Sequence, residues 1–271
     1  MKKTSSLLTV NKKLTLKHKC SQLRQTILQM IFTAGSGHLG GSFSCLDILV
    51  VLFDQFIDTH NHFILSKGHA APALYAVLAD KKIINPNLLN TFRQLNSPLQ
   101  GHPDSRFLPQ VKTCTGSLGQ GISMAAGMAL ANKLKNRSSR IFCLLGDGEI
   151  NEGQVWETAL VASHHQLDNL TIVIDKNHLQ QTGSTSEILN TEKISRKWRA
   201  FNWNVLEING NNLDQIFWAL EKAQIQPQKP TVIVANTIKG KGVSFMENNL
   251  DFHARPPTSS ELNQALKELK L

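Results

Sequence analysis

Two short apolar runs, each followed by polar residues, constrain the fold of this chain more than any other feature. Ile141 to Leu145 precedes Gly146-Asp147-Gly148, and Leu170 to Ile174 precedes Asp175-Lys176-Asn177. Apolar runs of this length, bounded by turn residues, are typical of buried strands, and a helical pattern lies between them. The stretch from Ile141 to Thr182 is therefore predicted to be a strand–helix–strand unit with parallel strands, and ligands of open α/β sheets bind at the carboxyl ends of such strands.

The Gly146-Asp147-Gly148 turn has the residue types that a phosphate and a metal require. Its glycines let the backbone turn sharply and approach a ligand closely, and the helix that follows directs free N–H groups to the same place. Asp147 adds a carboxylate, and Asn177 can add an amide oxygen; Mg²⁺ binds such oxygens together with phosphate and water. The alternative is that the tripeptide is only a turn and Asn177 only a strand-end residue.

Three histidines, His38, His69 and His102, each directly follow a glycine. A single histidine at the start of a helix is more often a hydrogen-bonded structural residue than a ligand. The repeated Gly-His pair favours side chains that point into one cavity, where the backbone comes close.

The rest of the chain alternates between helical and strand-like patterns. This alternation predicts an α/β fold, a mostly parallel sheet with helices on both faces, in one domain over residues 14–271 after a mobile basic tail at 1–13. We expect loops over 35–41, 98–109 and 184–190, and helices over 14–34, 45–56 with Ser44 as its cap, 70–79, 85–97, 122–135, 194–201 and 213–224, with a last helix capped by Ser259 or Ser260. Further strands are expected over 63–66, 205–208 and 232–237.

Composition and charge exclude several classes of protein. No apolar run reaches the ~18–20 residues of a membrane span, and the lysine-rich start has no secretory apolar core, so a cytoplasmic protein is expected. The four cysteines lack paired spacing and are expected to be reduced thiols. The net charge is +9, with no acidic residue before Asp47, but no nucleic-acid motif accompanies it. The positive field suits an anionic cofactor and sugar phosphates.

Several motifs, in this order, resemble those of one enzyme family. They are GHLGGS at 37–42, LSKGHA at 65–70, GHPD at 101–104, TGSLGQG at 115–121, GDG at 146–148 with an Asn thirty positions after Asp147, and TIKGKGVSF at 237–245. The set resembles the thiamine diphosphate-binding N-terminal half of transketolase, and more closely the separately encoded N-terminal subunit of a split transketolase, over about residues 15–270.

The resemblance implies a ketol transfer, in which a two-carbon unit passes from a ketose phosphate to an aldose phosphate on thiamine diphosphate. It implies that Asp147, Asn177 and the Leu179 carbonyl bind Mg²⁺ (or Ca²⁺ or Mn²⁺). It places His38 and His102 in the substrate channel and His69 and His253 at the diphosphate or the reacting groups, as the four catalytic histidines. The cofactor-binding set that it implies is His69, Gly116, Ser117, Leu118, Gly146, Asp147, Gly148, Glu149, Asn177, Lys239 and His253.

Two acidic residues, Glu152 and Glu157, have counterparts in the family, whereas the sequence around His253 departs from the family pattern. Glu152 and Glu157 match buried acids near the family's subunit interface; as first-turn carboxylates favoured by the helix dipole they have an equally good structural explanation. His253 lies in DFHARPP, where the family pattern has Trp before the histidine and Gly after it.

The family activates its cofactor with a glutamate on a second, pyrimidine-binding domain, which has no counterpart in these 271 residues. We therefore expect a chain that is inactive alone, self-associates, and joins a separate pyrimidine-binding subunit in a heterotetramer, with the pentose phosphate pathway as one setting. The alternatives are a subunit of an oxo-acid dehydrogenase, a deoxyxylulose phosphate synthase, or a non-catalytic regulatory subunit. The GHLGGS, SKGHA and GHPD motifs favour transketolase over the other two enzymes.

Overall fold

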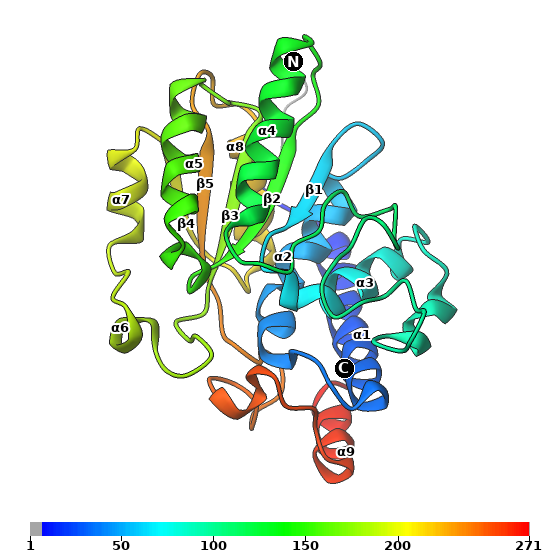
Figure 1. Ribbon diagram of the computed structural model, residues 1–271. Coiled ribbons are helices and arrows are strands. Elements are labelled where there is room, and N and C mark those ends of the chain that lie inside the picture. Colours follow the sequence, from blue (N-terminus) through cyan, green and yellow to red (C-terminus); the bar gives the residue numbers. More distant parts are fainter. Residues whose placement is uncertain (1–6, 271) are drawn as a thin grey trace.

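The computed structural model describes residues 7–270, and its centre is a five-stranded sheet (Figure 1). The strands are β1 (His62–Leu65), β2 (Ile141–Gly146), β3 (Leu170–Lys176), β4 (Asn204–Asn209) and β5 (Thr231–Asn236), in the order β1-β2-β3-β5-β4. All four pairings are parallel, and Gly146 of β2 is in register with Asp175 of β3. The predicted parallel sheet and the strand–helix–strand unit at its centre are confirmed.

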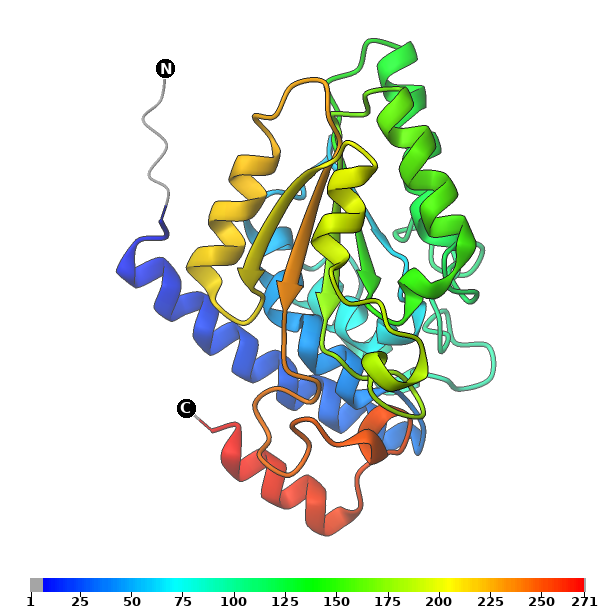
Figure 2. The same cartoon turned by 90° about the vertical axis from the view of Figure 1, so that its left-hand side faces the viewer.

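Helices cover both faces of the sheet because its strands are apolar on both sides. Figure 2 shows α8 on one side of the strands and α4 and α5 on the other. Phe142 and Leu144 pack with the first layer, whereas the alternate residues Ile141, Cys143 and Leu145 pack with the second. The first layer contains α1 (Val10–Ala34), α2 (Leu39–Gln55), α3 (Ala71–Asp80) and α8 (Leu213–Ala223); the second contains α4 (Gln120–Leu134), α5 (Gly153–His164) and α7 (Ile194–Ala200).

The chain ends in α9 (Ser259–Glu268), which packs against α1 (Figure 2). Its N-cap is Thr258, in a capping box with Glu261, so the predicted caps Ser259 and Ser260 are wrong by one or two positions. Ser21 and Gln25 of α1 both donate hydrogen bonds to the carbonyl of Leu269.

The starts of α1, α2 and α4 are predicted too late, that of α4 by only two residues. Helix α1 begins at Val10 with Thr9 as its cap, because Lys12 and Lys13 form ion pairs with Asp54 and with α8. Residues 10–13 are therefore helical, and residues 1–6 of the expected mobile tail lie outside the described residues. Helix α2 begins at Leu39, six residues before the prediction, because two consecutive glycines within it admit side chains from other elements. Ser44 is thus inside the helix and is not its cap.

Two predictions in the connecting segments are also wrong. The expected helix over 85–97 is only a 3₁₀ segment, Pro86–Thr91, since Arg93 and Asn96 have positive φ and end it. The expected loop over 184–190 contains the short helix α6 (Thr185–Ile188), which Ser184 caps. Shorter 3₁₀ segments lie at Gly68–Ala70, Glu149–Asn151 and Leu250–His253. Across residues 7–270, the helices are all too short or too polar to cross a membrane.

Candidate active site

A cavity of about 320 Å³ lies where the carboxyl ends of four strands meet three connecting segments. His69 follows β1, Asp147 follows β2, Asn177 follows β3 and Lys239 follows β5. The loops add His38 from the turn between α1 and α2, His102 from the loop before α4, and His253 from the 3₁₀ segment Leu250–His253. Parallel strands place their carboxyl ends at one edge of the sheet, which explains why residues so far apart in sequence share one cavity.

The turn before α2 directs His38 into this cavity. Gly35 caps α1 in the left-handed conformation, with φ at 63°. Gly37 has φ at 152°, and a Cβ there would lie 2.8 Å from Ile31. Only glycine fits at Gly37, because the backbone must both adopt this conformation and pass against α1. His38 then occupies the N-cap of α2 without capping it, so its ring is free for other contacts.

The four predicted catalytic histidines form one cluster. The ring centroid of His38 lies 5.3 Å from that of His69, 6.5 Å from that of His102 and 5.4 Å from that of His253. The rings of His69 and His253 are stacked at 5.8 Å. Burial, together with nearby cations, lowers the pKa of all four, to about 4 for His38 and about 3 for His253. The cluster is therefore neutral near pH 7, with ring nitrogens able both to accept and to donate a proton.

Asp147, Asn177 and Leu179 bring oxygen atoms to the ends of β2 and β3. The Asp147 carboxylate is 2% exposed and accepts hydrogen bonds from the backbone N–H groups of His178 at 2.6 Å and Gly148 at 3.0 Å. Burial, and then the nearby Asp175, raise the pKa of Asp147 to about 6. Asn177 is 5% exposed, and its Oδ1 accepts from the N–H of Leu179 at 3.1 Å.

Glu149 holds the turns around the cavity together. It is 2% exposed, and its two carboxylate oxygens accept from the backbone N–H groups of Gly119 at 2.9 Å and Gly146 at 3.0 Å, and from the hydroxyl of Ser66. Burial raises the pKa of Glu149. Both oxygens are thus occupied by protein groups, so the geometry gives Glu149 a positioning role beside the predicted cofactor contacts.

The chain is similar to proteins of one known family. The family model described as the transketolase thiamine diphosphate binding domain matches residues 16–270.

The chain belongs to the transketolase family.

Its relatives include the 6-deoxy-6-sulfo-D-fructose transketolase subunit of Clostridium sp. (strain MSTE9), 41% identical, with 94% of this chain and 96% of the relative covered. An apulose-4-phosphate transketolase subunit of Phocaeicola vulgatus is 35% identical, with 94% of each chain covered. The crystal structure of transketolase from Campylobacter jejuni superposes with a TM-score of 0.89 at 30% identity, covering 97% of this chain and 43% of that one. The chain spans about two fifths of that solved transketolase chain, and nearly the whole length of the relatives named as subunits. The predicted family, fold and transketolase-subunit function are confirmed.

The oxygen atoms present fit the divalent cation that the transketolase family implies. The donors are a buried carboxylate, a side-chain amide and the Leu179 carbonyl, and hard cations such as Mg²⁺ prefer an all-oxygen set of this kind. The Leu179 carbonyl already accepts a hydrogen bond from the Lys239 ammonium at 3.1 Å, so it faces positive charge. Groups of three or more His, Cys, Asp or Glu suited to a metal are absent from residues 7–270, which leaves this mixed set as the candidate.

Lys239 is a cation that contacts the Leu179 carbonyl directly. It is 1% exposed and contacts the carbonyls of Leu179 and Gln180, and its Nζ lies 2.7 Å from Nδ1 of His253. Burial, and then the charge of Lys67, lower the pKa of Lys239 to about 8. Although His253 has Phe252 where the transketolase pattern has Trp, it still lies in the cluster, and Arg255 lies over the Phe252 ring.

The sequence prediction missed a buried charge network beneath the cavity. Lys67 and Asp175 are both 0% exposed, with Nζ and Oδ2 2.5 Å apart. Ser44 of α2 and Thr237 after β5 also donate to Asp175, and Lys67 donates to the carbonyl of Gly41. The sequence feature that could have predicted this network is the position of Lys67 in the LSKGHA motif, directly after a strand. Gln180 and Gln181 also line the cavity without having been predicted.

Not all predicted residues face the cavity. Gly116 and Leu118 line it, as do Gly146 and Gly148, whereas Ser117 is exposed and is not among the lining residues. Glu152 and Glu157 are exposed in the single chain, so their predicted place at an interface stays a prediction.

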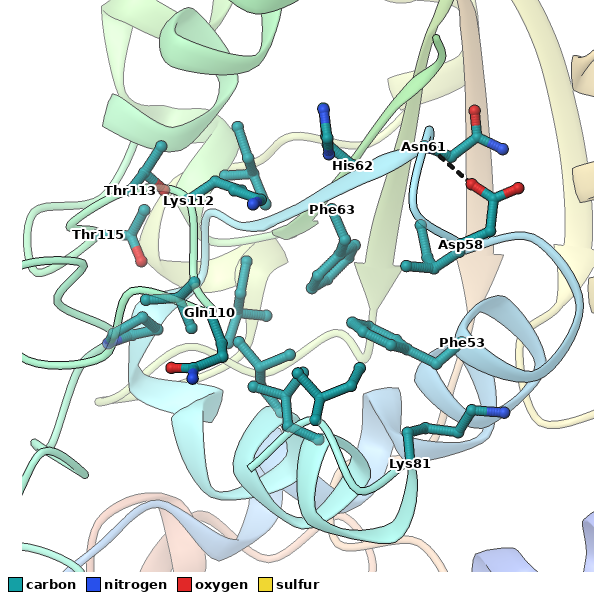
Figure 3. Close-up of a pocket in the computed structure, with 18 of the residues that line it drawn as sticks. Phe53, Asp58, Asn61, His62, Phe63, Lys81, Gln110, Lys112, Thr113 and Thr115 are labelled. Atoms are coloured by element: carbon teal, nitrogen blue, oxygen red, sulfur yellow. Dashed lines mark hydrogen bonds between the residues drawn. The ribbon is translucent and has the colours of Figure 1, made fainter. Parts of the chain in front are cut away.

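A larger cavity, of about 620 Å³, lies at the free edge of β1 and is a separate space (Figure 3). Its walls are mainly apolar, and Figure 3 shows Phe53 and Phe63 among the side chains that line it. Pro103 and Thr115 line it, and the N–H of Thr115 donates to the carbonyl of Pro103 at 3.3 Å, closing the base of the loop between them. Their neighbours His102 and Gly116 line the transketolase site, so this loop base separates the two cavities.

Proposed function

We propose that this chain is the diphosphate-binding half of a two-subunit transketolase that moves a two-carbon ketol unit from an anionic ketose to an aldose. The observation that carries the proposal is the single cavity in which the oxygens of Asp147 and Asn177 lie beside four neutral histidines. A metal–diphosphate site and a proton-handling site are thus adjacent, as a ketol transfer on a diphosphate cofactor requires.

Each group of residues has a distinct task in this proposal. When bound, thiamine diphosphate supplies the carbon nucleophile and the electron sink. Asp147, Asn177 and the Leu179 carbonyl would hold the divalent cation. Lys239 would bind diphosphate oxygens, as would the Gly148 N–H after exchanging its hydrogen bond to Asp147 for one to the diphosphate. His38 and His102 contact the hydroxyls of the sugar and accept or donate their protons, since neutral imidazole does both. His69 and His253 orient the groups between the metal and the sugar.

The substrate is proposed only as a class. One relative is named for 6-deoxy-6-sulfo-D-fructose and another for apulose-4-phosphate, and both names describe a sugar with an anionic group. The net charge of +9 favours such substrates, because a positive field attracts anions. The pentose phosphate pathway and a cytoplasmic location remain predictions.

A partner subunit is the second half of the proposal. Relatives of the same length are named as subunits, and the chain matches two fifths of a solved transketolase. We infer a heterotetramer of two such chains and two pyrimidine-binding subunits, in which the partner supplies the activating glutamate. Helix α4 suits self-association, since Gly127 faces open space and Leu134 is exposed.

The test is a ketol-transfer assay on the purified chain and on the complex that copurifies with it from its own cells. Both receive thiamine diphosphate and Mg²⁺, with xylulose 5-phosphate or a 6-sulfonated ketose as donor and ribose 5-phosphate as acceptor. We expect transfer by the complex alone, at a mass by sedimentation that fits two copies of each subunit. Robust transfer by the chain alone would contradict the split enzyme, and pyruvate decarboxylation by the complex would favour the oxo-acid dehydrogenase alternative.

A further inference from the structure

Arg93, which lies outside the set of predicted site residues, joins the two turns that carry His38 and His102. Its guanidinium donates through Nη1 to the hydroxyl of Ser36 at 2.5 Å, two residues before His38. Its backbone N–H donates to the carbonyl of Leu99 at 2.9 Å, three residues before His102. One residue therefore contacts both segments that deliver histidines to the cavity.

The guanidinium also lies against the backbone next to His102. A Cβ built on Gly101 would lie 2.8 Å from both Nε and Nη2 of Arg93, closer than such contacts occur. In its present position the guanidinium leaves no room for a Cβ at residue 101, so a larger residue there would displace it. Arg93 itself has φ at 59°, a left-handed conformation that is uncommon for a residue with a side chain and is maintained only where the surroundings enforce it.

Arg93 has none of the ion pairs found elsewhere in residues 7–270. Its Nε is buried without a hydrogen-bond partner, and the side chain is half-buried. A half-buried guanidinium without a carboxylate is unusual, because burying a charge is unfavourable unless the charge is paired. The partners of the guanidinium are the Ser36 hydroxyl and the Phe92 ring, whose centroid lies 5.7 Å from Cζ, and these compensate its charge only weakly.

We propose that Arg93 is a positioning residue of the ketol-transfer site, whose guanidinium, docked between Ser36 and Gly101, fixes His38 and His102 in the cavity. This inference rests on the proposed function for its catalytic meaning, but the placement of the two histidines can be tested without turnover.

The charge of Arg93 has a second effect on the same histidines. Burial is the largest cause of the lowered pKa of both His38 and His102, and Arg93 is the next. The other titratable groups around His38 are His69, His102, His253, Lys67 and Lys239, with the carboxyl groups of Asp147 and Glu149 lining the same cavity. The largest charge effects on His38 come from the cations, which lower its pKa. Arg93 thus helps to keep both rings neutral while it holds their turns in place.

Two substitutions separate position from charge. Arg93→Lys keeps the charge but loses the planar fork that spans Ser36 and Gly101. Arg93→Gln loses the charge and part of the fork. Gly101→Ala keeps Arg93 but places a methyl group against it, and serves as a second variant should either Arg93 variant fold poorly. Arg106→Gln is the matched control, since Arg106 is exposed and pairs with Asp104 on the same loop as His102.

The first measurement is a histidine titration of the isolated chain by NMR, with signals assigned through His38→Asn and His102→Asn variants. In Arg93→Gln we expect the pKa of His38 and His102 to rise by about one unit, a shift typical of losing one nearby charge. In Arg93→Lys and Gly101→Ala we expect loss of hydrogen-exchange protection at residues 36–38 and 99–102. Unchanged titration and protection in all three variants would overturn the proposal, and the Arg106→Gln control should show neither change.

The second measurement uses the holoenzyme complex. We expect kcat/KM for the sugar to fall about 10- to 100-fold in Arg93→Lys, the size of effect that misplaced groups produce. The Kd for thiamine diphosphate with Mg²⁺ should change by less than about twofold, because Arg93 does not line the cavity. An equal loss of cofactor affinity would overturn the positioning role. If the complex has no ketol-transfer activity at all, the proposed function fails, while the NMR result still tests the placement of the histidines.

Discussion

Asp147 combines burial with a lack of any cationic hydrogen-bond partner. Its carboxylate accepts only backbone N–H groups, and its pKa is raised to about 6. A buried carboxylate of this kind is unfavourable by itself and gains most from a bound cation. The side chain therefore has more to contribute to binding than to the stability of the free protein.

Replacing this one carboxylate should separate the two contributions. In Asp147→Asn we expect the melting temperature of the free chain to change little, and the increase in melting temperature on adding thiamine diphosphate with Mg²⁺ to disappear. Differential scanning calorimetry with and without both ligands measures this, and Asp104→Asn on an exposed loop is the matched control. A ligand-induced increase that survives in Asp147→Asn would exclude Asp147 as a metal ligand and favour a regulatory subunit.

At the scale of the elements, the ion pair of Lys67 and Asp175 connects β1, β3, α2 and the segment after β5. Burial opposes the charge of Lys67, but Asp175 and its neighbours raise the pKa of Lys67 above its usual value. Neither charge has access to water, so removing one leaves the other uncompensated.

We expect Lys67→Met to lower the free energy of unfolding by about 3–5 kcal/mol, the range found when one partner of a buried pair is removed. The double variant Lys67→Met with Asp175→Asn should recover part of this loss, because no net charge stays buried. Urea unfolding followed by circular dichroism measures both. If the double variant were no more stable than the single one, the pair would not act as a unit.

The elements that the sequence predicted well are those with strong local patterns. The runs at Ile141–Leu145 and Leu170–Ile174 are apolar throughout, so they identified two central strands, and their polar ends located Asp147 and Asn177. The early start of α2 was not predicted, because consecutive glycines are typical of a loop; only tertiary contacts with Lys239 and His69 keep them helical. Local pattern also gave no sign that Arg93 would end a helix and connect two loops, since its contact with Ser36 comes from a residue far away in the sequence.

For the whole molecule, titration of the site should make the fold sensitive to acid. Four site histidines have a pKa below the usual value, so between about pH 6.5 and 4 the unfolded chain binds protons there that the folded chain does not. Asp147 and Glu149 have a raised pKa and oppose this, because the folded chain binds their protons first. The four histidines favour proton binding by the unfolded chain, and only two carboxyl groups favour proton binding by the folded chain. The free energy of unfolding should therefore fall as the pH falls through this range.

Urea unfolding at pH 7.5 and pH 5 measures this prediction, with lower stability expected at pH 5. His38→Asn removes one of the four groups and should make the loss between the two pH values smaller. His18→Asn, on the exposed part of α1, is the matched control. Equal stability of the unmodified chain at the two pH values would show that the histidine cluster is not kept neutral by the fold.

The contact between α1 and the residue that follows α9 has a consequence for how the protein is made. Ser21 and Gln25 lie in the first helix, and the carbonyl to which they donate belongs to Leu269. A ribosome synthesises α1 long before α9, so the surface of α1 beneath α9 stays uncovered until α9 has been made. A chain that stops before α9 leaves this surface accessible to chaperones and proteases, which can thereby distinguish it from a chain that contains α9.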